Sequence, residues 1–312
     1  MAHPVLGLHH VTATVDGAQE DLDFCRGLLG LRLVKKTVNF DNHDVYHFYY
    51  GDERGSPGTI WTTFPYAGHG VRRGTQGAGQ VVTTAFSVPA GSLDFWAARL
   101  AERGVEARRR GRRFGDDVLA LTDPSGLDLE LVAASGDGRA PWTGIVGAES
   151  AIRGLHGVTM MVRRAGPTRE LMCGLLGYRV VDETEGRARL AVHEDAPGHF
   201  IDLLVAPGAE PAVNGLGTVH HVAMAIAGDD EQLRLREELV RLGIQVTPVR
   251  DRCYFRSIYF REPGGVLFEV ATTRPGFTLD EELAALGRGL ELPPWEEPHR
   301  QAIEAALPPV SH

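Results

Sequence analysis

Two pairs of histidines and one glutamate are the residues whose types and spacing could do chemistry in this sequence. His9 and His10 lie near the start of the chain, His220 and His221 lie far downstream, and Glu269 follows in the segment GVLFEVATT. Two imidazoles and one carboxylate are the ligand set of non-haem Fe(II), because they hold the ion on one side and leave positions open for reactants. Zinc in a His2Glu site is the close alternative. The chemistry therefore requires that these distant segments meet.

Strand alternation selects one histidine of each pair, because successive side chains on a strand point to opposite faces. In GLHHVTATV, His10 shares its face with two threonines, whereas His9 falls on the apolar face. In TVHHVAMAI, His221 shares its face with small alanines that leave room for a ligand, and Glu269 lies opposite the apolar face of its own strand. Each residue alone could be a hydrogen-bonded core residue. A buried carboxylate is costly unless it is paired or metal-bound, however, so the three together predict a metal site.

The elements that must position these residues form a fourfold repeat. Each unit reads as a strand, one amphipathic helix and about three further strands, which is a βαβββ module. One such module leaves a sheet edge and a half-buried face uncovered, and pairing two modules covers both. We therefore predict an α+β fold in which four βαβββ modules form two cups or barrels. The modules span residues 7–64, 79–135, 153–206 and 217–273.

The repeat divides the chain into three predicted regions. An N-terminal domain over 1–140 contains the first two modules, and a C-terminal domain over 150–275 contains the last two. Residues 276–312 are predicted to form a helical tail, with pieces at 279–290 and 298–307. This tail either packs on the domains or covers a site.

The complete ligand set arises only when the first and fourth modules share a cup. The second module carries Glu130 where the fourth carries Glu269, but it has Val82 where a histidine is required. The third module has Gly157 at that position, with His156 one residue too early. We therefore predict one metal-binding cup from modules one and four, and one metal-free cup from modules two and three. The competing interpretation, a site in modules three and four that uses His156, needs a β-bulge to shift the register.

Composition argues against several other classes of protein. The 312-residue chain has a net charge of −9 and no long basic block, so we expect no nucleic-acid partner. The arginine-rich run at 108–113 is interpreted as a solvated turn, relieved by Asp116 and Asp117. Three scattered cysteines do not make a disulfide framework, which favours a cytoplasmic location. Neither a signal peptide nor an apolar stretch of about 20 residues is evident, so we expect no membrane association.

Four longer stretches carry a family resemblance: GLHHVTATV, DVYHFYYGDERGSPGTIWTTFP, TVHHVAMAI and DRCYFRSIYFREPGGVLFE. They resemble the ring-cleaving dioxygenases of the vicinal-oxygen-chelate (glyoxalase/bleomycin resistance/dioxygenase) superfamily, and in particular its hydroquinone-type extradiol branch. The resemblance implies two vicinal-oxygen-chelate cups and a cofactor that is Fe(II), with Mn(II) as the alternative. It also implies that His10, His221 and Glu269 are the metal ligands, in agreement with the strand alternation.

The same resemblance implies which residues surround the ligands. Arg252 and Tyr259 fall where the family places such residues, and His220 and His9 also have counterparts there, although alternation turns these two away from the metal. Tyr259 could hydrogen-bond a substrate oxygen or relay a proton, or it could only fill the cup. Arg252 could hold an anionic oxygen through its fork of donors, or it could form a salt bridge at the rim. His47, in VYHFYY, is interpreted as a strand residue rather than a catalyst.

The activity that the resemblance implies is an Fe(II)-dependent ring cleavage that inserts O2 into a hydroquinone- or catechol-type aromatic diol. The expected partners are a small aromatic diol and O2, and the scaffold is compatible with a homo-oligomer. Two other functions stay open. One is a glyoxalase-like isomerase or lyase with Ni, Co or Zn that uses no O2, and the other is a non-enzymatic protein that binds a quinone or a drug.

Overall fold

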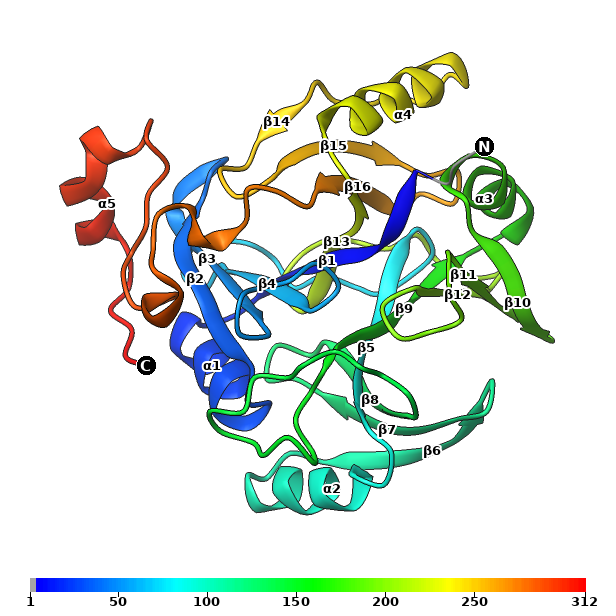
Figure 1. Ribbon diagram of the computed structural model, residues 1–312, viewed down its shortest axis with the longest axis horizontal. Helices are drawn as coiled ribbons and strands as arrows, with labels where there is room; N and C mark the ends of the chain where they lie inside the picture. Colours follow the sequence, from blue (N-terminus) through cyan, green and yellow to red (C-terminus); the bar gives the residue numbers. More distant parts are fainter. Residues whose placement is uncertain (1–3) are drawn as a thin grey trace.

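The computed structural model describes residues 4–312 and arranges the strands in two curved eight-stranded sheets (Figure 1). The first sheet has the order β14-β15-β16-β13-β1-β4-β3-β2. Its strands are Arg250–Asp251, Arg256–Arg261, Leu267–Thr272, Thr218–Ile226, Val5–Val15, Ile60–Pro65, Asn42–Gly51 and Arg32–Asn39. All of them come from the first and fourth modules, so the predicted pairing of these modules is confirmed.

The second sheet has the order β10-β11-β12-β9-β5-β8-β7-β6 and uses only strands of the second and third modules. Its strands are Arg179–Thr184, Arg187–Ala191, Phe200–Val205, Gly154–Val162, Gln80–Pro89, Asp128–Ala134, Asp116–Thr122 and Ala107–Arg113. The fold is therefore the predicted α+β arrangement of two cups. Each cup combines strands from both halves of the chain. The domain boundaries 1–140 and 150–275 stay a prediction from the sequence repeat.

The strand register brings the two ends of the chain together. Strand β1 pairs antiparallel with β13, so that His10 lies opposite Ala223 and Thr12 lies opposite His221. Strand β13 pairs parallel with β16, so that Ala223 lies beside Glu269. Because side chains two residues apart share a face, His10, His221 and Glu269 point to the same side of the first sheet.

One helix of each module covers the outer side of its sheet. Helices α2 (Leu93–Glu102) and α4 (Asp229–Arg241) pack on β6–β8 and on β15–β16 (Figure 1). Helices α1 (Ala18–Leu22) and α3 (Ala165–Leu171) each continue into one π-helical turn, at Asp23–Leu28 and Met172–Leu176. The core lies between these helices and the sheets, where Leu239 of α4 and Phe268 of β16 are fully buried. The predicted apolar face of β16 is thus the core face, which leaves Glu269 on the other side.

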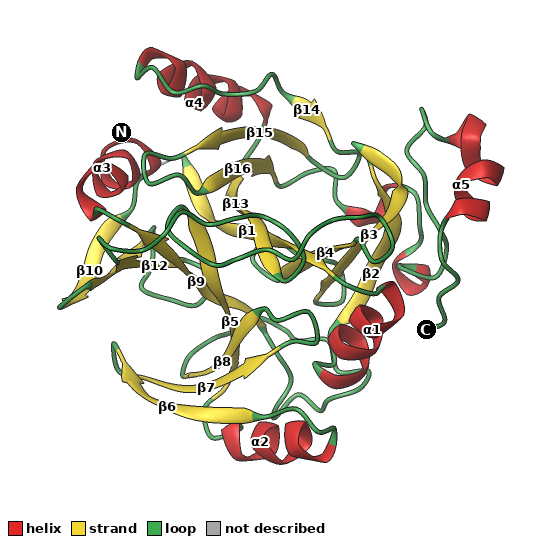
Figure 2. Cartoon of the chain, turned by 180° about the vertical axis from the view of Figure 1, so that it is seen from behind, coloured by secondary structure: helices red, strands yellow, loops and turns green. Residues whose placement is uncertain are grey.

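The C-terminal segment is less helical than predicted. Within 279–290 the structure has only short 3-10 turns, at Phe277–Leu279 and Leu283–Ala285, so that expectation was wrong. The cause is a contact between segments far apart in the sequence: the carboxylates of Asp280 and Glu281 reach the fully buried ammonium of Lys35, at 2.5 and 2.6 Å, and this holds the segment against β2. The second piece is confirmed as Glu297–His299 and helix α5 (Arg300–Ala306), which lie beside β2 and β3 (Figure 2).

The arginine-rich run is a strand rather than the expected turn. It forms β6, an edge strand paired antiparallel with β7, because Asp116 and Asp117 begin the next strand instead of closing a loop. Arg109 pairs with Asp94, and Arg112 with Asp117, at the surface. Such charges protect an exposed sheet edge from pairing with another chain. Among residues 4–312, no helix has the length and apolar character that crossing a membrane requires.

Candidate metal centre

The three predicted ligands meet inside the first cup. Nε2 of His10 lies 3.2 Å from Nε2 of His221 and 3.2 Å from Oε2 of Glu269. Nε2 of His221 lies 2.8 Å from the same oxygen. All three side chains are buried, and their candidate ligand atoms lie within 4.8 Å of one another. The structure therefore assembles two imidazoles and one carboxylate from β1, β13 and β16.

The electrostatics of these residues fit a divalent cation. Oε2 of Glu269 is buried and has no hydrogen-bond donor among the described residues, whereas Oε1 accepts a hydrogen bond from Ser257 Oγ. Burial opposes the charge, yet the neighbouring imidazoles of His10 and His221 hold the pKa of Glu269 well below its usual range. Burial also lowers the pKa of His221. The carboxylate oxygen of Glu269 and the Nε2 atoms of the two imidazoles face one point, which is a donor set that a divalent metal can use.

The other histidine of each pair orients the ligand ring. Nδ1 of His9 lies 2.9 Å from Nδ1 of His10, and Nδ1 of His220 lies 2.7 Å from Nδ1 of His221. Burial, followed by the charge of the adjacent histidine, lowers the pKa of both outer histidines to about 3, so they stay neutral. A proton on Nδ1 of His10 or His221, donated to the outer ring, leaves Nε2 free to face the other ligands. Alternation led to the expectation that both outer histidines point away from the metal, but their rings contact the candidate ligands.

Tyr259 and Arg252 lie together beside the ligands. Tyr259 is the register partner of Glu269 on β15, and its hydroxyl accepts a hydrogen bond from Arg252 Nε at 3.0 Å. Burial, with the charge of Glu269, raises the pKa of Tyr259, so the hydroxyl stays protonated and keeps a hydrogen to donate. Arg252 also donates to Asp41 Oδ2 at 2.9 Å, which links β2–β3 to the fourth module. Arg252 thus contacts Tyr259 and makes a rim salt bridge at the same time.

A cavity of about 250 Å³ opens onto this cluster. Its walls are largely aromatic, and Asn39, Phe40 and Asp41 at the tip of the β2–β3 hairpin lie on its rim. The other lining residues are His10, Thr14, His47, Tyr49, Phe64, Tyr66, His220, His221, Arg252, Phe255, Tyr259 and Glu269. No residue of the tail 276–312 lines the cavity, although Trp295 packs edge-on against Phe40, at 5.6 Å between ring centres. The tail therefore supports the rim rather than covering the site.

His47, interpreted from the sequence as a strand residue, lies on β3, and the structure also places it in the cavity wall. Its Nε2 lies 2.8 Å from Thr62 Oγ1, and that hydroxyl donates to Thr12 Oγ1 at 2.9 Å. Because the Thr62 hydroxyl donates its hydrogen to Thr12, it can only accept a hydrogen bond from His47. Nε2 of His47 therefore carries the ring proton, and Nδ1 is free to act as a hydrogen-bond acceptor. Burial holds the pKa of His47 well below its usual range. The available signal was strand alternation, which puts His47 on the same face of β3 as Tyr49.

The second cup holds ion pairs at the corresponding positions. Nε2 of His156 lies 3.3 Å from Asp116 Oδ2, and Glu130 accepts two hydrogen bonds from Arg113. His156 and Glu269 belong to different sheets, so the competing site in modules three and four was wrong. Glu130 is buried and its polar contact is with Arg113.

Paired βαβββ modules that gather two imidazoles and one carboxylate inside a curved sheet define the vicinal-oxygen-chelate class of protein. The sequence profile of the Glyoxalase/Bleomycin resistance protein/Dioxygenase superfamily matches residues 7–131 and 154–270, and the chain belongs to this superfamily.

Individual relatives resemble the chain over nearly its whole length. It is 43% identical over 310 residues, 99% of this chain and 98% of the relative, to MhqO of Bacillus subtilis (strain 168), whose name assigns it provisionally to the ring-cleaving dioxygenases. It is 35% identical over 297 residues, 93% of this chain and 92% of the relative, to a chlorohydroquinone/hydroquinone 1,2-dioxygenase of Sphingobium indicum (strain UT26S). A crystal structure of a Bacillus subtilis protein, titled provisionally as a dioxygenase, has 42% identity and a TM-score of 0.94 and covers 99% of both chains.

Proposed function

We propose that this chain is a metal-dependent ring-cleaving dioxygenase that uses Fe(II), with Mn(II) as the alternative, to insert O2 into a hydroquinone- or catechol-type diol. The observation that carries the proposal is the convergence of His10, His221 and Glu269 on one face of an aromatic-lined cavity. The names of MhqO and of the Sphingobium enzyme support the reaction class.

The three ligands would hold the ion, and each has a partner that keeps it in place. His9 and His220 orient the two imidazoles, and Ser257 orients the carboxylate. When bound, a redox-active divalent metal supplies Lewis acidity toward a diol oxygen and a path for electrons between the ring and O2. Two histidines and one carboxylate leave coordination positions free for both reactants.

The cavity selects the size and kind of substrate. Its volume of about 250 Å³ lies below the roughly 300–1,000 Å³ that is usual for drug-sized ligands, which suits a single substituted ring. Phe64, Tyr49 and Phe255 supply apolar surface for that ring and exclude water from the ligands. Their rings can stack on or meet the edge of an aromatic substrate, which positions it for reaction.

Polar side chains around the ring would handle protons and charge. The protonated hydroxyl of Tyr259 donates a hydrogen bond to a substrate oxygen, while Arg252 stabilises negative charge on that oxygen. His47 offers Nδ1 as an acceptor for a hydroxyl proton of the diol, since its Nε2 is engaged by Thr62. The hydrogen bond from the Arg252 guanidinium also keeps the Tyr259 hydroxyl in one orientation.

An oxygen electrode distinguishes this function from the alternatives. Protein purified without oxygen and loaded with Fe(II) is mixed with hydroquinone, methylhydroquinone or catechol. We expect O2 consumption at one molecule per diol, and none with the iron-loaded Glu269→Ala variant. A protein that contains stoichiometric metal but consumes no O2 with any of these diols would contradict the proposal and favour an isomerase. The absence of bound divalent metal would instead favour a binding protein.

A further inference from the structure

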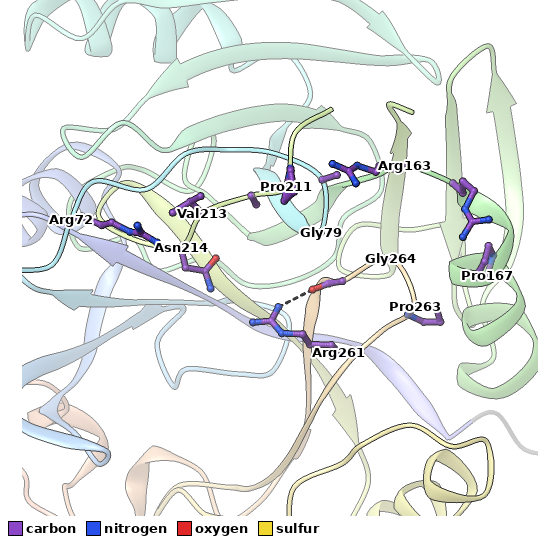
Figure 3. A pocket seen from close by; sticks show the side chains of 14 residues that line it. Arg72, Gly79, Arg163, Pro167, Pro211, Val213, Asn214, Arg261, Pro263 and Gly264 are labelled. Carbon is purple, nitrogen blue, oxygen red and sulfur yellow. Dashed lines mark hydrogen bonds between the residues drawn. The ribbon is translucent and has the colours of Figure 1, made fainter. Parts of the chain in front are cut away.

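A second and larger cavity, of about 580 Å³, lies where the two sheets meet (Figure 3). Its walls come from the linkers before β5 and β13, the end of β9, and the β15–β16 turn. The lining residues that the argument uses are Arg72, Arg163, Arg164, Asn214 and Arg261. None of the residues that line this cavity also lines the cavity at the metal centre. It is therefore a separate site.

The cavity is basic in an otherwise acidic protein. Four arginines line it, no acidic residue does, and the chain has a net charge of −9. In the part of the chain that the structure describes, none of the four guanidinium groups lies within ion-pairing distance of a carboxylate. Other surface arginines do form such pairs, for example Arg300 with Glu297 at 2.7 Å. Unpaired positive groups around one hollow repel one another, and a bound anion relieves that repulsion.

Two of the arginines are held in place by the backbone. Arg261 Nη1 donates to the carbonyl oxygen of Gly265 at 2.8 Å, the dashed bond in Figure 3, and Arg163 Nε donates to that of Ala209 at 2.8 Å. A guanidinium has five N–H donors in a fixed plane, so one such bond leaves the others for a ligand. These contacts orient the side chains before anything binds, and lower the entropy lost on binding.

The amide of Asn214 adds a neutral donor. Its Oδ1 accepts a hydrogen bond from Gln80 Nε2 at 2.9 Å, so its NH2 group remains free to donate. The cavity wall is fixed by the close approach of Gly79 and Gly265, which have φ of +86° and +99°. A Cβ on Gly265 would lie 3.3 Å from Gly79 Cα, which is a tight contact, and the positive φ of both residues favours glycine.

We propose that this cavity binds a small molecule that carries a di- or triphosphate group. Arginine forks match phosphate oxygens in pairs, and four arginines from three segments suit an extended, multiply charged group better than a single charge. The cavity volume lies within the usual range for sites that bind metabolite-sized ligands. Asn214 lies in the linker before β13, which carries His221, and Arg261 is the last residue of β15, which carries Tyr259.

The test is calorimetric titration of the metal-loaded protein with pyrophosphate at low ionic strength. The site variant is Arg72→Ala/Arg261→Ala. The matched control is Arg54→Ala/Arg103→Ala, which removes the same charge from exposed arginines outside both cavities. We expect saturable binding that the site variant weakens by roughly tenfold or more and the control by less than about twofold. Far-UV circular dichroism establishes that both variants are folded.

A third variant separates this cavity from the metal centre, since pyrophosphate can also bind metals. Glu269→Ala should bind pyrophosphate as tightly as the parent protein. Loss of binding in Glu269→Ala, equal weakening in the control pair, or no saturable binding would each overturn the proposal. Self-association that the site variant abolishes, without pyrophosphate binding, would show that the cavity is an interface between copies and would overturn it as well.

Discussion

The substitution Tyr259→Phe removes one hydroxyl from the wall of the metal centre and leaves the ring in place. That ring meets the edge of His221, at 5.8 Å between ring centres, so the packing around the ligands should persist. Arg252 loses its contact with the hydroxyl but keeps the salt bridge to Asp41. The change therefore isolates the hydrogen bond that Tyr259 would give to a substrate oxygen.

The expected magnitude follows from the charge on that oxygen. A hydrogen bond to a charged group contributes about 1.5–3 kcal/mol, which corresponds to a decrease in kcat of about 10- to 100-fold. Metal content should not change, because Tyr259 is not one of the three ligands. The assay is O2 uptake with a hydroquinone, measured together with the metal content of the same sample.

Tyr46→Phe is the matched control. Tyr46 also lies on a strand of the first sheet, but its hydroxyl donates to the carbonyl oxygen of Pro308 at 3.1 Å, outside the cavity. Its turnover should equal that of the parent protein. A Tyr259→Phe variant whose kcat stays within about twofold of the parent would refute the reasoning and leave Tyr259 as an aromatic wall residue.

Three further changes probe the supports of the site and of the fold. Ser257→Ala removes the donor to Glu269 Oε1 and should weaken metal affinity by about 10- to 100-fold, measured by competition with a chelator; unchanged affinity would contradict the role of Ser257. Lys35→Met removes the cation beside the buried carboxylate of Glu281 and should lower the free energy of unfolding by about 3–5 kcal/mol in denaturant titrations; a loss under about 1 kcal/mol would show that the pair is dispensable. Burial raises the pKa of Asp123 to about 7, so the folded state binds more protons than the unfolded state from about pH 4 to 7, and stability falls as the pH rises through that range. Between pH 5 and 8, ionisation of this carboxyl lowers the free energy of unfolding by about 2–3 kcal/mol. Asp123→Asn should remove that pH dependence; curves of unfolding free energy against pH that run parallel for variant and parent would refute the assignment.

The arrangement of the site was largely predictable because it depends on strand alternation. A period of two residues decides which histidine of each pair shares a face with Glu269, and the repeat decides which modules must meet. Both follow from local side-chain patterns, which is why the pairing of β1 with β13 matched the prediction.

Features that depend on contacts between distant residues were not predictable in this way. The segment at 279–290 has apolar spacing typical of a helix, but Asp280 and Glu281 reach Lys35 on β2 instead. The salt bridge from Asp41 to Arg252 and the basic cavity also join segments that no periodicity relates. The arginine run at 108–113 became a strand because β7 was available to pair with it.

The most direct test of the central claim is the metal content of protein purified without oxygen, compared between Glu269→Ala and Glu130→Ala. These glutamates occupy equivalent positions in the two cups, so the pair controls for the loss of a buried carboxylate. We predict one divalent ion per chain in the parent protein and in Glu130→Ala, and nearly none in folded Glu269→Ala. Full metal content in folded Glu269→Ala would contradict the assignment of His10, His221 and Glu269 as one metal site.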